Sequence, residues 1–370
     1  MSSKVSFQRK EPEMNSYFTH IISFFMSVAA FFSFLFVYPV SPQTDSVKFA
    51  ASLGAGWNLG NTLEAWQIPE PENTETCWGN PETAEELISF IKNCGFNTVR
   101  IPVTWFQHMD SQGRIDPAWL DRVGEVTDYV LDNGMFAVIN VQHDDQSWLI
   151  ADRENEKTAC DLLAEIWTQI AARFADYDEK LIFETMNEPR VVGAEFEWSG
   201  NDEGREVVNR LNEAALSAIR KTGGNNDKRY VFVTGYAASD LEENYTAIEV
   251  PDDPHVMVSL HYYPGTAHRS EFSDCENRLS LKERRDIYKK IRGFYKTFSR
   301  KGVGVCITEF GWTDREHLDN LADKAAFLVN TAGRFGFCCF VWDNGADFRV
   351  IDRNPPSVAF PSYADAITGG

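Results

Sequence analysis

With 370 residues, of which 43% are hydrophobic and 13% aromatic, the chain can bury a large core and fits one large α/β domain or two smaller ones. A formal net charge of −20 excludes nucleic acid and anionic membrane surfaces as binding partners, because these are bound through Lys and Arg. A neutral or polymeric ligand suits this charge better.

The amino terminus carries a separate apolar segment. Lys4, Arg9 and Lys10 precede an uncharged stretch at 21–38, IISFFMSVAAFFSFLFVY, which is long enough to cross or nearly cross a bilayer. We interpret residues 1–45 as a secretory signal peptide or an uncleaved signal anchor, with a buried core helix as the alternative. We therefore expect a secreted protein, or one that contacts the membrane only through this segment and holds its folded domain outside the cell.

From about residue 47 onward, strand-like apolar runs alternate with amphipathic stretches. The eight strand-like runs lie at 54–60, 97–103, 135–141, 180–186, 229–235, 255–261, 302–309 and 337–342. The helix-like stretches have apolar residues three and four apart, and most end on Gly: 82–95, 117–134, 159–177, 205–224, 281–302 and 321–336. Strands that alternate with helices in this way are parallel, and eight repeats predict a single-domain (β/α)8 TIM barrel, with a doubly wound open sheet as the alternative.

The sequence predicts neither a nucleotide cofactor nor a metal. The first strand is followed by GWNLGNT at 56–62, which lacks both the Walker spacing and the dinucleotide-binding fingerprint. The cysteines form no two-by-two metal pattern, and we expect no obligatory disulfide among them: Cys77, Cys94, Cys160, Cys275, Cys306, Cys338 and Cys339. The last two are adjacent in an apolar run, so we expect them to point to opposite faces of a strand.

Polar side chains gather where the predicted strands end. In chain order they are Arg100, Gln142 and His143, Asn187 and Glu188, His261 and Tyr263, Glu309, and Trp342. The carboxyl ends of barrel strands meet at one mouth, so Glu188 and Glu309 are expected to face each other there. Two carboxyl groups, one protonated and one ionised, are what cleavage of a glycosidic bond requires.

Several motifs together resemble glycoside hydrolase family 5, in particular its subfamily 4 of bacterial endoglucanases. They are GWNLGNTLEAW, TCWGNP, FNTVRIPVTW, the stretch from IWTQ to MNEPR, HYYP, CITEFG and VWDNG, and the likeness spans roughly residues 49–348. The resemblance implies that 46–370 form a (β/α)8 catalytic domain without a cofactor. It also implies retaining double displacement on β-1,4-glucans such as cellulose and mixed-linkage glucan, with Glu188 as general acid/base and Glu309 as nucleophile.

Supporting roles follow from the same resemblance and from side-chain chemistry. Arg100 is expected to keep Glu309 ionised, and Tyr263 to donate a hydrogen bond to it. The remaining residues are expected to bind the substrate or to support the site. Asn187 bonds the sugar 2-hydroxyl, His261 forms a hydrogen bond near Glu188, and Trp342 stacks on a pyranose ring. Asn61, Gln142 and His143 complete the expected set. The expected partner is a β-glucan polysaccharide, and we expect a monomer.

The third strand departs from the family pattern. The family has an Asn-x-His-His type motif here, whereas this chain has Asn140, Val141, Gln142 and His143. Gln142 can donate and accept hydrogen bonds but cannot carry charge, and strand alternation predicts that His143 points to the opposite face. The substitution is compatible with an active enzyme, and the alternative is a weakened enzyme or a glucan-binding relic. Separately, a xyloglucanase or β-mannanase of the same family is an alternative, because loop contacts to the sugar hydroxyls and to side-chain xylose decide the substrate.

A binding module is the competing class of protein. It would need only aromatic platforms, for which the candidates besides Trp342 are Trp57, Trp66 and Trp78. A binding module could dispense with the two glutamates, and their presence favours an enzyme.

Overall fold

The computed structural model describes residues 42–265, 279–313 and 318–369. The chain divides into two compact units, Met1–Val40 and Ser41–Gly370, and every described residue belongs to the second. The apolar segment at 21–38 and Cys275 therefore lie outside the described residues, and the leader and its boundary after residue 45 stay predictions. Within the described ranges, no helix has the length and apolar character needed to cross a bilayer.

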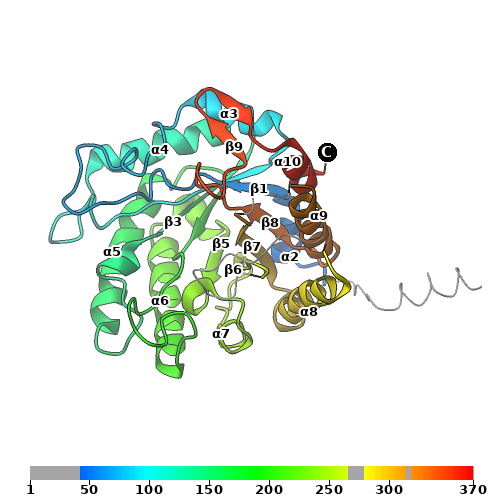
Figure 1. The fold of residues 1–370 in the computed structure, drawn as a ribbon. Helices are drawn as coiled ribbons and strands as arrows, with labels where there is room; N and C mark the ends of the chain where they lie inside the picture. Colours follow the sequence, from blue (N-terminus) through cyan, green and yellow to red (C-terminus); the bar gives the residue numbers. More distant parts are fainter. Residues whose placement is uncertain (1–41, 266–278, 314–317, 370) are drawn as a thin grey trace, which may run out of the picture. The chain divides into compact units, whose positions relative to one another are not determined.

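The second unit is built on a closed parallel barrel (Figure 1). Its strands are β1 (Ala55–Asn58), β2 (Thr98–Ile101), β3 (Phe136–Asn140), β4 (Leu181–Glu184), β5 (Val231–Thr234), β6 (Val256–His261), β7 (Gly304–Phe310) and β8 (Cys338–Val341). Each strand pairs with the next, and β1 also pairs with β8, with Trp57 in register with Val341. This closure confirms the predicted (β/α)8 barrel and rules out the open sheet.

Helices surround the barrel (Figure 1). They are α2 (Asp45–Ser52), α3 (Glu85–Asn93), α4 (Pro117–Asp132), α5 (Glu156–Arg173), α6 (Asp202–Lys221), α7 (Glu242–Thr246), α8 (Leu281–Thr297), α9 (Leu318–Arg334) and α10 (Pro361–Thr368). Side chains cap several of them, and Ser280 forms a full capping box with Glu283 at the start of α8. The six predicted helices are confirmed, whereas α2, α7 and α10 were missed because each has eight residues or fewer, too few for a periodic signal.

The amino-terminal half of the barrel interior is apolar. One buried cluster joins α2 and the residue after it to the strands from β3 to β8, and its members are Ala50, Leu53, Val138, Ile182, Phe232, Met257, Cys306, Cys338 and Phe340. A Cβ on Gly56 would come within 1.9 Å of the Phe340 ring, so only glycine fits beside it. Cys338 belongs to this cluster and Cys339 does not, as expected for neighbours on opposite faces of a strand.

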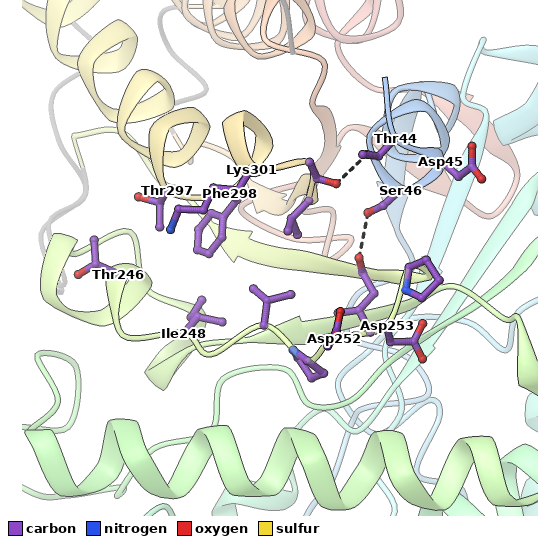
Figure 2. A pocket seen from close by; sticks show the side chains of 16 residues that line it. Thr44, Asp45, Ser46, Thr246, Ile248, Asp252, Asp253, Thr297, Phe298 and Lys301 are labelled. Atoms are coloured by element: carbon purple, nitrogen blue, oxygen red, sulfur yellow. Dashed lines mark hydrogen bonds between the residues drawn. The ribbon is translucent and has the colours of Figure 1, made fainter. Parts of the chain in front are cut away.

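A surface pocket lies at the same end of the barrel (Figure 2). It is lined by α2, by the loop that precedes β6 and by the end of α8. Hydrogen bonds from Thr44 Oγ1 to the Gly302 carbonyl, at 2.6 Å, and from Ser46 Oγ to the Val256 carbonyl, at 2.9 Å, join these segments. Val256 begins β6 and His261 ends it, so the pocket and the predicted site lie at opposite ends of the strands.

Candidate active site

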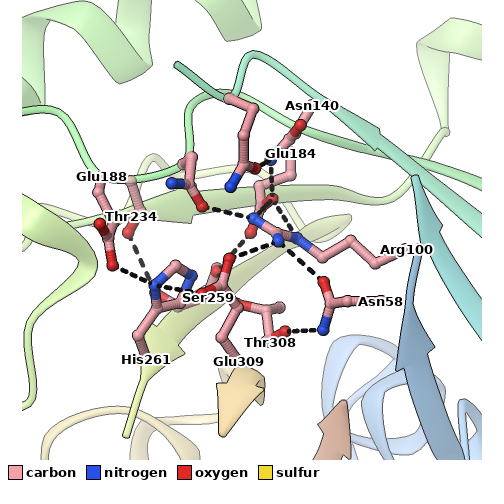
Figure 3. A network of polar contacts seen from close by, with 12 residues as sticks. Asn58, Arg100, Asn140, Glu184, Glu188, Thr234, Ser259, His261, Thr308 and Glu309 are labelled. Carbon is pink, nitrogen blue, oxygen red and sulfur yellow. Dashed lines mark hydrogen bonds and ion pairs between the residues drawn. The ribbon is translucent and has the colours of Figure 1, made fainter. Parts of the chain in front are cut away.

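Arg100, on β2, is the centre of a fully buried polar layer at the carboxyl half of the barrel (Figure 3). Its guanidinium lies 2.6 Å from Glu184 Oε2 and 2.7 Å from Glu309 Oε1. It also donates to the Oδ1 atoms of Asn58 and Asn187, at 2.9 and 2.8 Å. Burial lowers the pKa of Arg100, but the two carboxylates more than offset this and raise it. Arg100 therefore stays charged and fixes four side chains at once.

Glu184, on β4, was missed by the sequence analysis. Besides Arg100, its carboxylate accepts hydrogen bonds from Asn140 Nδ2 at 2.9 Å and from Ser259 Oγ at 2.6 Å. Its signal in the sequence is an acidic residue at the end of a buried apolar strand, which indicates a buried cation or hydrogen-bond donors as partners. Asn58 closes the layer on the other side by donating to the carbonyl of Thr308 at 2.9 Å.

Glu309 lies on β7, where the register with β6 shifts between Leu260 and His261. Such a shift changes the direction of side chains at the barrel rim. One carboxylate oxygen of Glu309 accepts from Arg100, and the other accepts from the Tyr263 hydroxyl at 2.8 Å. Burial and the neighbouring Glu309 raise the pKa of Tyr263 well above 10, so its hydroxyl keeps its proton and acts as a donor.

Glu188 follows β4 and pairs with His261 at the end of β6. His261 Nδ1 lies 2.7 Å from Glu188 Oε1 and 3.5 Å from Glu309 Oε2. Burial raises the pKa of Glu188, but the hydrogen bond and charge of His261, together with Arg190, lower it to about 2. Burial lowers the pKa of His261, and the two glutamates raise it above 6.5. In the resting site the shared proton therefore lies on the imidazole, one hydrogen bond away from the Glu188 carboxylate.

Glu188 and Glu309 face each other across His261. A carboxylate oxygen of each and a ring nitrogen of His261 all lie within 4.8 Å of one another. A cation could bridge such a spacing, but the guanidinium of Arg100 at 2.7 Å from Glu309 already supplies positive charge. We interpret the group as an acid-base pair. The separation is close to the roughly 5 to 5.5 Å typical of retaining glycosidases and too short to seat a water between the carboxyl groups.

The structure places Gln142 in the polar layer and His143 at the mouth. Gln142 is buried, and its Oε1 accepts from Asn140 Nδ2 at 2.6 Å. His143 was expected on the opposite face, but β3 ends at Asn140, so strand alternation no longer governs its direction. Its ring centroid lies 5.7 Å from that of Trp78. Burial lowers the pKa of His143 to about 4, and the nearby Glu188 charge opposes this.

Trp342 and Asn61 lie where the loops after β8 and β1 meet. A Cβ on Gly60 would come within 2.9 Å of the Trp342 ring, which shows how closely the loops pack. Asn61 has a positive φ of 56°, its backbone N–H donates to the Glu64 carboxylate, and its carbonyl accepts from Asn80 Nδ2 at 2.8 Å. Trp342 is half-buried, which leaves part of its ring accessible.

The aromatic platforms expected on the mouth differ in exposure. Trp57 is fully buried and donates from Nε1 to Asp343 Oδ2 at 2.9 Å, so its assignment as a platform was wrong. Trp66 is half-buried and Trp78 is 37% exposed. Trp198, which the sequence analysis did not select, is 36% exposed, and the Arg190 guanidinium lies 4.4 Å from its ring. Partly exposed rings therefore lie near both His143 and Glu188.

Comparison with known proteins identifies a family of glycoside hydrolases. Residues 64–348 match the family model described as Cellulase (glycosyl hydrolase family 5). The chain is 38% identical over 351 residues to Endoglucanase A of Clostridium longisporum, which covers 90% of this chain and 68% of that protein. It is also 38% identical over 337 residues to Cellulase/esterase CelE of Acetivibrio thermocellus, which covers 88% of this chain but only 40% of that protein.

Solved structures give the same result. A GH5-4 broad specificity endoglucanase from Clostridium acetobutylicum superposes with a TM-score of 0.82 at 37% sequence identity, covering 88% of this chain and all of that one. A GH5 xyloglucan-specific endo-β-1,4-glucanase from a metagenomic library, in complex with cellotriose, superposes with a TM-score of 0.83 at 35% identity, covering 88% of this chain and 98% of that one.

Proposed function

The chain belongs to glycosyl hydrolase family 5, and from this premise we propose that Glu188 and Glu309 cleave β-1,4-glucans with retention of anomeric configuration. The protein is a glycoside hydrolase of the endoglucanase type. The observation that supports the residue roles best is the approach of the two carboxylates to within 4.8 Å of each other, with His261 between them. That spacing suits direct attack by a carboxylate on the sugar.

In the first step, a carboxylate oxygen of Glu309 attacks the anomeric carbon, and a glycosyl ester forms as the glycosidic C–O bond breaks. The leaving sugar oxygen takes a proton from Glu188, which receives it from His261 through their 2.7 Å hydrogen bond. Arg100 and Tyr263 each bind one oxygen of Glu309, which holds the nucleophile ionised and oriented.

In the second step, water attacks the anomeric carbon of the ester and gives its proton to Glu188, and Glu309 leaves as a carboxylate. Asn187 assists both steps. Arg100 can only donate, so the oxygen of the Asn187 amide must face it, at 2.8 Å, and the amide N–H₂ is left to bond the sugar 2-hydroxyl. This hydrogen bond strengthens as charge develops on the sugar.

The substrate class follows from the mouth of the barrel. Trp342, Trp66, Trp78 and Trp198 offer faces on which several pyranose rings can stack. We propose cellulose and mixed-linkage β-glucan as substrates. Xyloglucan is the second candidate, because the chain is 35% identical to a neighbour named as xyloglucan-specific. We further propose that the protein acts outside the cell as a monomer, with residues 1–45 as its export signal.

The test is the stereochemistry of hydrolysis, combined with a substrate panel. Proton NMR of the first product from a soluble β-glucan is expected to show the β-anomer, and an α-anomer as first product would overturn the roles of both glutamates. Reducing-sugar release from soluble cellulose, mixed-linkage glucan, xyloglucan and mannan then ranks the substrates. Activity on mannan alone would reject the glucan assignment.

A further inference from the structure

Arg190 is a second buried cation beside Glu188. Its Nη1 donates to the Glu188 carbonyl at 3.1 Å and lies 3.5 Å from Glu188 Oε2 and 2.9 Å from Asp145 Oδ2. Its Nε donates to Glu197 Oε1 at 3.1 Å, and the guanidinium lies over the Trp198 ring. The side chain is 9% exposed, so these contacts fix it in one position. Arg190 therefore holds both the backbone and the carboxylate of Glu188.

Asp145 contacts the same Arg190 Nη1 atom that lies beside Glu188, and it has no role in the mechanism above. It belongs to the short helix η1 (Asp144–Gln146) that follows β3, and it is buried. Its Oδ2 contacts Arg190 and accepts from Gln146 Nε2 at 3.0 Å, whereas its Oδ1 is buried and has no hydrogen-bond partner among the described residues. A carboxylate in this position is tolerated because Arg190 lies beside it. Its pKa is raised to about 6, chiefly by burial, with Arg190 opposing the rise.

We propose that Arg190 and Asp145 are a positioning pair for Glu188, in which Arg190 orients its carboxyl group and Asp145 offsets the Arg190 charge so that Glu188 can still take up a proton. The inference rests on the proposed function, in which Glu188 is the general acid/base. Neither residue of the pair is required to touch the substrate. Both act through Glu188, and their charges act on it with opposite sign.

Other titratable groups also face Glu188. They are His261 at the end of β6, Tyr263 shortly after it, His143 after β3 and, through His261, Glu309 on β7. The alkaline limb of kcat/KM therefore reports loss of the proton that Glu188 and His261 share, and every nearby charge contributes to its position. Arg190 and Asp145 can be tested separately from the other groups because neither residue takes part in the hydrogen bond between Glu188 and His261.

The test is the alkaline limb of kcat/KM on one aryl β-cellobioside with a poor leaving group, whose departure needs the proton of Glu188. In Arg190→Gln the loss of positive charge is expected to move the limb up by about one pH unit. In Asp145→Asn the loss of negative charge is expected to move it down by about half a pH unit. Arg205→Gln is the matched control. Arg205 holds the same loop through the Ser199 carbonyl, at 3.1 Å, and its other hydrogen bonds go to Asn244 and Asp202 rather than to Glu188, so no shift is expected.

If the substitutions merely disturbed the loop, the alkaline limbs of Arg190→Gln and Asp145→Asn would move in the same direction or would not move at all. Either result would overturn the proposal. Arg190→Lys, which keeps the charge, is expected to return the limb to its wild-type position. In Arg190→Gln, kcat/KM should also fall more steeply with rising leaving-group pKa than in wild type, because poor leaving groups need the proton. Thermal melts check folding of each variant.

Failure of this inference can be told apart from failure of the proposed function. Glu188→Ala is expected to keep kcat/KM on a dinitrophenyl cellobioside and to regain turnover with azide, which can replace the attacking water without a base. If Glu188→Ala behaves in this way but the limbs of Arg190→Gln and Asp145→Asn do not move apart, the positioning pair is rejected and Glu188 keeps its role. If Glu188→Ala loses glycosylation of the activated substrate, the proposed function itself is wrong, and the positioning pair is rejected with it.

Discussion

Gln142 Oε1 accepts a 2.6 Å hydrogen bond from Nδ2 of Asn140, and the same nitrogen donates to Glu184 at 2.9 Å. The residue that departs from the family pattern is thus tied into the layer around Arg100. Because its oxygen is engaged inside the protein, the amide N–H₂ is the part of Gln142 that can bond the substrate. A glutamine can therefore support positioning here, but it brings no charge.

We predict that Gln142→His raises turnover. One ring nitrogen of a neutral imidazole can accept from Asn140 while the other donates toward the substrate. The ring can also take up a proton, which the amide cannot, although it then gives up the hydrogen bond from Asn140. A charge-assisted bond formed only in the transition state is worth about 1.5 kcal/mol, or about tenfold in rate. Steady-state kinetics on one soluble β-glucan at several pH values, with thermal melts, measure the effect. Unchanged or lower turnover in a folded variant would mean that Gln142 is fully accommodated.

The two glutamates are expected to respond differently to substitution. Glu309→Gln should abolish turnover on every substrate, because no other described carboxylate can form the glycosyl ester. Glu188→Ala should lose about 10²- to 10⁴-fold on β-glucan, the usual contribution of general acid catalysis, yet still release the aryl group of an activated cellobioside. Burst kinetics with dinitrophenyl cellobioside separate the two outcomes. Equal losses of activity in the two variants on the activated substrate would contradict the assigned roles.

Much of this site could be predicted because parallel strands bring their carboxyl ends together. Arg100, Asn187 and the pair His261 and Tyr263 come from the ends of three strands, β2, β4 and β6, and the barrel alone places them around the two glutamates. No spacing rule within a single strand could have paired Arg100 with Glu309, which is 209 positions away. The prediction depended on recognising the eightfold repeat.

The sequence analysis was weakest where tertiary contacts decide the surroundings of a side chain. His143 was placed by strand alternation, but it follows the last residue of β3, where the chain is free to turn. Trp57 was chosen for its residue type, and only the barrel shows that its ring is buried against Asp343. Glu184 was overlooked because one acidic residue in an apolar run has no meaning until Arg100 is known to face it. These are tertiary contacts, and local patterns do not encode them.

The buried pair of Arg100 and Glu184 gives a stability prediction. Removing the carboxylate in Glu184→Ala leaves the buried guanidinium with Glu309 as its one remaining carboxylate partner among the described residues, and it removes one acceptor of the Ser259 hydroxyl. Breaking a buried ion pair in this way is expected to cost about 3 to 5 kcal/mol of unfolding free energy. Urea unfolding at neutral pH measures the loss.

Glu206→Ala is the control for that measurement. Glu206 pairs with Arg153 at 2.6 Å, but its side chain is 58% exposed, so the loss should stay below about 1 kcal/mol. A loss in Glu184→Ala as small as in this control would mean that water or a neighbouring side chain replaces the missing carboxylate, and that Arg100 does not depend on Glu184.

The buried carboxyl group of Glu64 leads to a prediction of how the free energy of unfolding changes with pH. Its buried carboxyl group accepts the backbone N–H of Thr62 at 2.9 Å and that of Asn61, which holds the loop beside Trp342. Burial raises its pKa from 4.5 to about 7, although the backbone hydrogen bonds oppose the rise. The folded state therefore binds this proton more tightly than the unfolded chain does. The resulting stability is fully present below pH 4.5 and is lost as the pH rises through 7, because ionising Glu64 in the folded protein then costs free energy.

We expect the stability of the wild type relative to Glu64→Gln to fall between pH 4.5 and 8 by at most about 3 kcal/mol, the equivalent of the pKa shift. The quantity to compare is the difference in unfolding free energy between the wild type and Glu64→Gln. Asp144, whose pKa is also raised to about 7, adds the same pH dependence to both proteins and cancels in that difference. Glu70→Gln, at an exposed position of the same loop region, should show no such trend. Urea unfolding at a series of pH values decides the point. A difference that stays constant or grows with pH would mean that the two backbone hydrogen bonds outweigh burial and keep Glu64 ionised, so that its charge would be part of what holds the loop of Asn61 in place.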